Sequence, residues 1–187
     1  MIPTLWLMTD PRIGEPALMS ALHRLPRGAA VIFRHYGWTT DARRALFGKV
    51  RAVARRRGLL LLLAGNARTA RAWGADGWHG RRGASAHVRQ DMLHSAPVHD
   101  VTEMRAAERN GADVLLLSPV FPTRSHRGAR ALGRVRFALL VRQARRPVIA
   151  LGGMDAQRWQ EMRGTGATGW AAIDGWIKNG LSRRFHA

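Results

Sequence analysis

Eight short apolar segments recur along the chain, and a helical pattern follows each of them. The apolar segments lie at residues 5–9, 29–34, 59–64, 77–79, 92–97, 114–120, 148–151 and 169–173. The helical patterns lie at residues 15–25, 40–57, 67–73, 84–90, 101–109, 134–145, 155–163 and 176–184. Segments that are apolar at nearly every position are typical of parallel strands covered on both faces. The alternation therefore predicts an α/β fold with a parallel sheet.

Eight strand–helix units predict closure into a (β/α)8 TIM barrel, a single domain that spans residues 1–187. The chain is shorter than the ~200–250 residues usual for this fold, so the third and fourth helices, at 67–73 and 84–90, are expected to be short. A doubly wound open sheet is the alternative, because periodicity alone does not distinguish an open sheet from a closed one. Asp100 and Asp155 each precede a helical pattern, and both are expected to cap a helix N-terminus.

The net charge of +19 comes almost entirely from arginine, since Lys49 and Lys178 are the only lysines among 31 basic residues. Clustered arginine can bind nucleic acid, but no aromatic and basic RNA-binding motif accompanies it here. Arginines spread over solvated helix faces explain the charge as well, and so does attraction to small anions. We therefore do not expect nucleic acid to be the partner.

The sequence excludes several other classes of protein. It contains no cysteine, so disulfides, thiolate catalysis and thiolate metal sites are absent. No apolar run reaches the roughly 18 residues of a membrane-spanning helix. The first residues lack the basic and apolar regions of a secretory signal, and the expected location is cytoplasmic.

Polar residues and glycines gather where the predicted strands end, which is where barrels of this type place their ligand sites. Gly152-Gly153 follows a buried strand, and its backbone could bind a phosphate or simply form a tight turn. Arg34 ends another strand, where a buried cation requires an anion or a carboxylate partner. Thr123 and Ser125 are candidate ligand donors, and Asn66 could either bind a ligand or cap the next helix.

The segments at 111–113, 118–123 and 147–154 resemble those of the thiamine phosphate synthase family, which includes the thiazole tautomerases. They read Gly-Ala-Asp, Ser-Pro-Val-Phe-Pro-Thr and Pro-Val-Ile-Ala-Leu-Gly-Gly-Met. Weaker similarities lie at 7–10, 74–79 and 169–173. The resemblance covers most of the chain in order, and it implies a barrel that couples a hydroxymethylpyrimidine diphosphate to a thiazole phosphate, releasing pyrophosphate.

The resemblance also assigns roles to residues at the strand ends. The catalytic residues that it implies, on the pyrophosphate side, are Arg34, Asn66 and His126. His126 takes the place of a lysine of the family, although Arg124 or Arg127 could also replace that lysine. Its implied thiazole-phosphate ligands are Thr123, Ser125, Gly152 and Gly153.

The sequence departs from the family on the side that binds Mg²⁺. Ala67 stands where the family has a metal-binding aspartate, and residues 80–85 contain no second carboxylate. A glutamine and a lysine of the family are Ile32 and Tyr36 here. The family implies Mg²⁺, but no metal ligand is predicted in this chain. Asp174 replaces a phosphate-binding serine, which is unfavourable unless it turns away or pairs with an arginine.

The expected function is that of a thiamine phosphate synthase, a transferase acting on phosphorylated pyrimidine and thiazole substrates. A barrel that binds such a phosphate without catalysing the coupling is one alternative. A thiazole tautomerase is disfavoured, because those relatives have a histidine where this chain has Pro119. A basic scaffold for nucleic acid or protein remains a third possibility.

Overall fold

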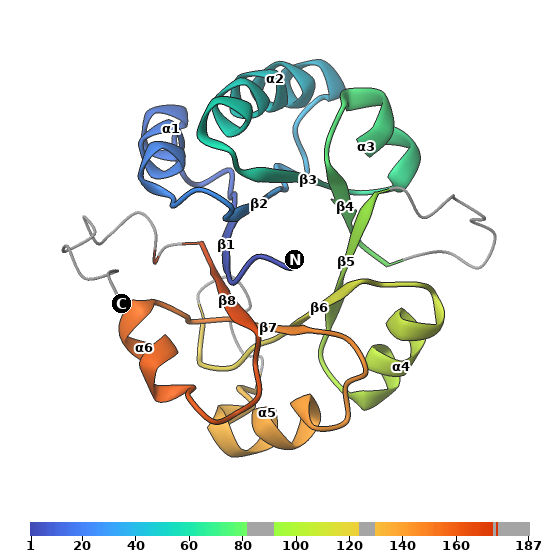
Figure 1. Ribbon diagram of the computed structural model, residues 1–187. Coiled ribbons are helices and arrows are strands. Elements are labelled where there is room, and N and C mark those ends of the chain that lie inside the picture. Colours follow the sequence, from blue (N-terminus) through green and yellow to red (C-terminus); the bar gives the residue numbers. More distant parts are fainter. Residues whose placement is uncertain (82–91, 124–129, 174, 176–187) are drawn as a thin grey trace.

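The computed structural model describes residues 1–81, 92–123, 130–173 and 175. Its eight strands form one closed parallel barrel, shown along its axis in Figure 1. The strands are β1 (Leu5–Met8), β2 (Ala30–Phe33), β3 (Leu60–Ala64), β4 (Gly77–His79), β5 (Leu93–Val98), β6 (Val114–Leu117), β7 (Val148–Leu151) and β8 (Gly169–Ala172). Each strand pairs in parallel with the next, and β8 pairs with β1. The predicted (β/α)8 barrel is confirmed, and the open sheet is excluded.

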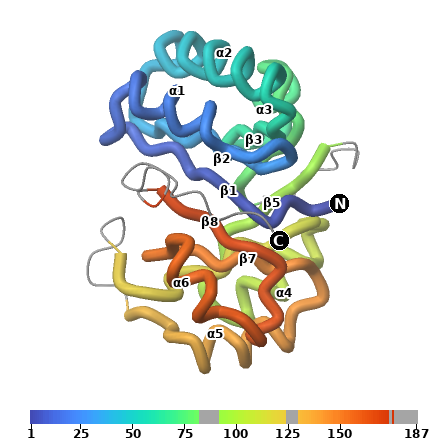
Figure 2. Tube along the Cα trace, turned by 60° about the vertical axis from the view of Figure 1, so that its left-hand side comes forward, coloured from blue at the N-terminus to red at the C-terminus, as the bar shows by residue number. Residues whose placement is uncertain are grey.

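Helices surround the barrel, with α1 to α3 on one side and α4 to α6 on the other (Figures 1 and 2). Those of the described residues are α1 (Glu15–Arg24), α2 (Thr40–Arg57), α3 (Ala67–Trp73), α4 (Val101–Arg109), α5 (Gly133–Val141) and α6 (Ala156–Glu161). The third predicted helix is short, with seven residues. The helices predicted at 84–90 and 176–184 lie outside the described residues.

The barrel interior is filled by alternate side chains of the strands, and the intervening side chains pack beneath the helices. The interior cluster contains Trp6, Met8, Ala30, Ile32, Leu62, Ala64, Val114, Leu116, Ile149 and Ala171. The outer faces of the strands, with Phe33 and Leu115 among them, join the larger core that the helices cover. Burial on both faces explains why these strands are apolar at nearly every position.

Two local features set how the segments at the barrel mouth begin and end. Both predicted caps are confirmed, because Asp100 and Asp155 accept hydrogen bonds from backbone amides in the first turns of α4 and α6, each at 2.8 Å. The strand predicted over 114–120 ends at Leu117 instead. Pro119 has no N–H to offer a neighbouring strand. The chain bends there, and Val120 N–H donates to the carbonyl of Leu151 at 2.9 Å.

Across the described ranges, no helix combines the length and the apolar character needed to cross a membrane.

Candidate functional site

A pocket of about 80 Å³ lies at the C-terminal ends of the strands, where the fold places ligand sites. Four predicted site residues line it: Arg34 from the end of β2, Thr123 after β6, and Gly152 and Gly153 after β7. Residues distant in the sequence thus meet in one place, as the convergence of strand ends predicted. Ser125, His126 and Asp174 lie outside the described residues.

Gly152 and Gly153 form a turn that only glycine can occupy without strain. Their φ angles are +96° and +63°. A Cβ atom on Gly152 would lie 2.7 Å from the Cα atom of Pro119, and one on Gly153 would lie 2.7 Å from the carbonyl oxygen of Pro122. The amide of Phe121 donates to the Gly152 carbonyl at 3.0 Å. The turn therefore packs directly against residues 119–122, of which Pro119 also lines the pocket.

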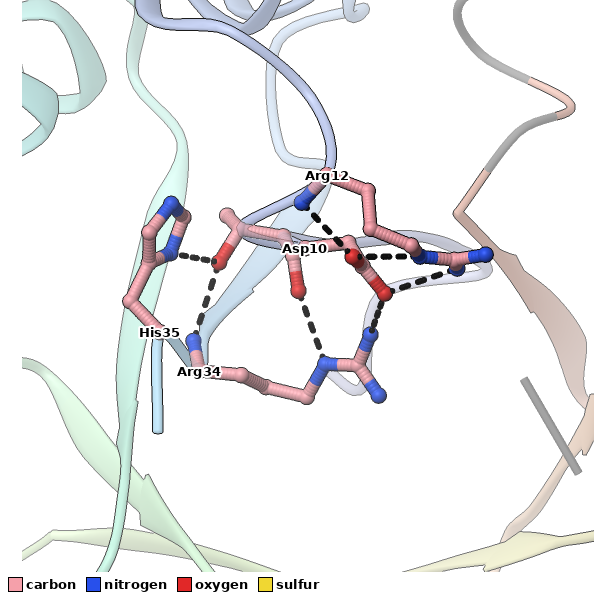
Figure 3. A network of polar contacts seen from close by, with 5 residues as sticks. Asp10, Arg12, Arg34 and His35 are labelled. Atoms are coloured by element: carbon pink, nitrogen blue, oxygen red, sulfur yellow. Dashed lines mark hydrogen bonds and ion pairs between the residues drawn. The ribbon is translucent and has the colours of Figure 1, made fainter. Parts of the chain in front are cut away.

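Arg34 is a largely buried cation, with 17% of its side chain exposed. Its Nε atom donates to the Thr9 carbonyl at 2.7 Å, and its Nη2 atom donates to Oδ2 of Asp10 at 3.0 Å. Figure 3 shows the Arg34 guanidinium directed toward the Asp10 carboxylate. The sequence predicts an anion or a carboxylate partner for this arginine, but Asp10 is not among the predicted site residues. The available signal was that Thr9-Asp10 ends the first strand segment.

Asp10 is shared between two arginines (Figure 3). Arg12 donates to its carboxylate from the backbone amide at 3.0 Å, from Nε at 2.8 Å and from Nη2 at 2.9 Å. The side-chain hydrogen bonds from Arg12 lower the pKa of Asp10 to about 2, and Arg34 adds to the effect. Asp10 is therefore ionised near neutral pH, and its two oxygens accept hydrogen bonds from both guanidinium groups and from the Arg12 amide.

Among the described residues, the mouth shows no cluster of side chains that fits the Mg²⁺ ion implied by the sequence resemblance. Nowhere in the described ranges do three or more histidine or acidic side chains gather in a way that could hold a metal ion. Asp10 faces two arginines. Glu103, in the first turn of α4, accepts hydrogen bonds from Arg81 at 2.5 Å and from His99 at 2.8 Å. The geometry thus supports anion binding by arginine.

The turn after β2 is fixed from several directions. His35 has a φ of +41°, which is rare for a residue other than glycine. Its ring stacks on Phe33 with centroids 4.7 Å apart, and its Nδ1 atom pairs with Oγ1 of Thr9 at 3.0 Å. Burial lowers the pKa of His35. Arg43 of α2 donates to the Arg34 carbonyl at 2.9 Å. These contacts hold the backbone that presents Arg34 to the pocket.

Asn66 lies outside the pocket. Its side chain is exposed, and its Oδ1 atom accepts a hydrogen bond from the amide of Thr69 at 2.8 Å, which caps α3. In the structure Asn66 therefore caps α3, which is one of the two roles that the sequence left open.

Substitution of Asn66 separates these two roles. We expect Asn66→Ala to lower the free energy of unfolding by about 1 kcal/mol, because an N-cap is lost. Asn66→Asp keeps the capping oxygen and should leave stability almost unchanged, as urea denaturation of both variants would show. A capping role alone predicts that neither variant changes ligand binding at the mouth; a loss of binding in the stable Asn66→Asp variant would contradict it.

His79 is buried inside the barrel at the end of β4, beside Ala64 of β3. Its Nδ1 atom pairs with Oγ of Ser95 at 2.9 Å. Burial lowers the pKa of this imidazole to about 3. It does not line the pocket.

Comparison with known proteins gives one family. The family model described as thiamine monophosphate synthase matches residues 5–175. The thiamine-phosphate synthase of Bacillus velezensis is 29% identical over 170 residues, 83% of this chain and 75% of that protein. The Mycobacterium avium enzyme of that name is 38% identical over 122 residues. This match covers 61% of this chain and about half, 54%, of that relative.

A solved structure agrees with these sequence matches. The thiamine phosphate pyrophosphorylase of Pyrococcus furiosus superposes with a TM-score of 0.78 and 26% identity, covering 91% of this chain and 85% of that one. The closed barrel, the pocket at its mouth and the family match along almost the whole chain agree. This chain belongs to the thiamine monophosphate synthase family.

Proposed function

We propose that the protein is a transferase that couples a hydroxymethylpyrimidine diphosphate to a thiazole phosphate, giving thiamine phosphate and pyrophosphate. The observation that carries this proposal is the meeting of Arg34 with Gly152 and Gly153 in one pocket at the barrel mouth. A cation and an open backbone turn suit two phosphorylated substrates bound side by side. The family match supports the same reaction.

In this reaction the bond between the pyrimidine methylene carbon and the diphosphate oxygen breaks, and the electron pair leaves with pyrophosphate. The thiazole nitrogen then attacks the resulting cation and forms the new carbon–nitrogen bond. Arg34 would stabilise the charge that develops on the leaving group, because a preorganised guanidinium acts strongly where water is excluded. The Thr123 hydroxyl and the Gly152-Gly153 backbone would hold the thiazole phosphate and so align its ring nitrogen.

The direct test is a coupling assay with both purified substrates, run with and without Mg²⁺. We expect thiamine phosphate to form, detected after conversion to its fluorescent oxidation product. Absence of thiamine phosphate under both conditions would overturn the proposal.

A second candidate is a barrel that binds a thiamine-related phosphate without coupling. The commitment of Asp10 to two arginines, together with Ala67 at a position where relatives bind metal, favours it. Saturable binding of thiazole phosphate without any turnover would identify this function. A thiazole tautomerase has less support, since Pro119 lines the pocket and no histidine of the described residues does.

A further inference from the structure

We propose that Arg34, held in place by Thr9 and Asp10, forms an anion site that works without a divalent cation. The site would bind the diphosphate group of the substrate through the outer edge of the guanidinium. The inference rests on the proposed function only in naming a diphosphate as the anion. Three features of the structure support it: the donors that Arg34 leaves open, the contacts that fix it, and the net positive charge of Asp10 with its two arginine partners.

The first feature is the hydrogen-bonding inventory of Arg34. A guanidinium carries five N–H donors, of which two are on Nη1. Nε donates to the Thr9 carbonyl and Nη2 to Asp10, whereas Nη1 donates to none of the described residues. In Figure 3 this end of the side chain carries no dashed line. A buried guanidinium that lines a pocket with an open Nη1 suits the oxygens of a phosphate.

The second feature is the way in which Arg34 is fixed. Its side chain is anchored on the carbonyl of Thr9 and the carboxylate of Asp10. Its backbone amide donates to Oγ1 of Thr9 at 2.9 Å, and the same oxygen pairs with His35 in the turn of unusual φ. Thr9 therefore acts as a positioning residue, joined to both the side chain and the backbone of Arg34. An anion would bind to donors already in place, which lowers the entropic cost.

The third feature is the local charge. Two guanidiniums share the single carboxylate of Asp10, so the cluster is net positive and attracts an anion. A divalent cation would be repelled by the same cluster, and it would find no open carboxylate there, because the carboxylate oxygens of Asp10 accept hydrogen bonds from both arginines. The arginines supply the positive charge that a metal ion would otherwise bring.

Calorimetric titration with inorganic pyrophosphate tests this inference. The full-length protein is titrated in EDTA and again in Mg²⁺ at the same ionic strength. We expect binding in EDTA and no tightening by Mg²⁺, which competes for the same phosphate oxygens. Arg34→Lys keeps the charge but cannot reach Thr9, Asp10 and the anion together, so we expect affinity to fall about tenfold or more.

Matched variants separate position from charge. Arg56→Lys, on an exposed part of α2, is the control and should bind pyrophosphate as the parent does. Thr9→Val removes the shared hydroxyl and should weaken binding by about threefold to tenfold, whereas Thr9→Ser should restore it. Circular dichroism identifies any variant that fails to fold. If Thr9→Val fails to fold, Arg34→Lys still tests the site.

The outcomes are distinct. Binding seen only with Mg²⁺ would overturn the metal-independent site, and so would unchanged affinity in Arg34→Lys. Absence of pyrophosphate binding under both conditions would overturn it as well. If pyrophosphate binds in EDTA through Arg34 but the coupling assay yields no product, this inference stands and only the proposed reaction fails.

Discussion

Replacing Gly152 by alanine is expected to lower the free energy of unfolding by about 3 kcal/mol and to abolish phosphate binding at the barrel mouth. Two causes combine. The φ of +96° is costly for any residue with a Cβ atom, and that atom would lie 2.7 Å and 2.8 Å from Cα and Cβ of Pro119. Relief of the clash must move either the glycine turn or the segment that carries Pro119, and both form the pocket.

Gly164→Ala is the matched control for this substitution. Gly164 also has a positive φ, +80°, but it is exposed, and a Cβ atom there would have no neighbour within 4 Å. We expect a cost of only about 1 kcal/mol and no effect on the pocket. Urea denaturation and titration with thiamine phosphate measure both properties. Equal costs for the two alanine variants would mean that close packing of Gly152 against Pro119 contributes nothing.

The second large effect is a loss of stability in mild acid that originates at His79. Its pKa is about 3 in the folded protein because the imidazole is buried, against 6.5 in an unfolded chain. Below pH 6.5 the unfolded state therefore binds a proton that the folded state does not. The contribution of the uncharged His79 to the free energy of unfolding is therefore fully present above that pH, and it is lost as the pH falls toward 3. We expect a loss of about 2 kcal/mol between about pH 7 and pH 5.

His79→Gln isolates this contribution. Glutamine keeps a polar partner for Ser95 but does not titrate, so the decrease in unfolding free energy should shrink by about 2 kcal/mol over the same pH interval. The substitution can lower stability at every pH without changing this expectation, since only the dependence on pH is compared. His35, whose pKa is also lowered by burial, contributes in the same direction and remains in the variant. Asp10, with a pKa of about 2, changes the free energy of unfolding only in stronger acid. Full retention of the pH dependence in His79→Gln would refute the assignment.

The barrel could be predicted from the sequence because most of its strands are buried on both faces and are therefore apolar at nearly every position. The pocket could be predicted in part for a related reason. All parallel strands of a barrel end at the same face, so Arg34, Thr123, Gly152 and Gly153 had to approach one another. No knowledge of distances was needed for that conclusion.

The partner of Arg34 could not be predicted, because it depends on the register of two strands. Met8 pairs with Ile32, and continuing that register places Asp10 beside Arg34. A shift by one residue would turn Asp10 away from the barrel interior. Apolar segments such as 5–9 and 29–34 do not encode that register. The role of Asn66 was ambiguous for a different reason, since the same side-chain oxygen can cap a helix or contact a ligand.

The most direct test of the central claim is a crystal structure of the protein grown with thiamine phosphate. We expect the phosphate to lie against the Gly152-Gly153 turn within hydrogen-bonding distance of Thr123, with the thiamine rings directed toward Arg34. Thiamine phosphate bound elsewhere, with the pocket between Arg34 and the glycine turn lacking ligand density, would contradict the assignment of this pocket as the substrate site.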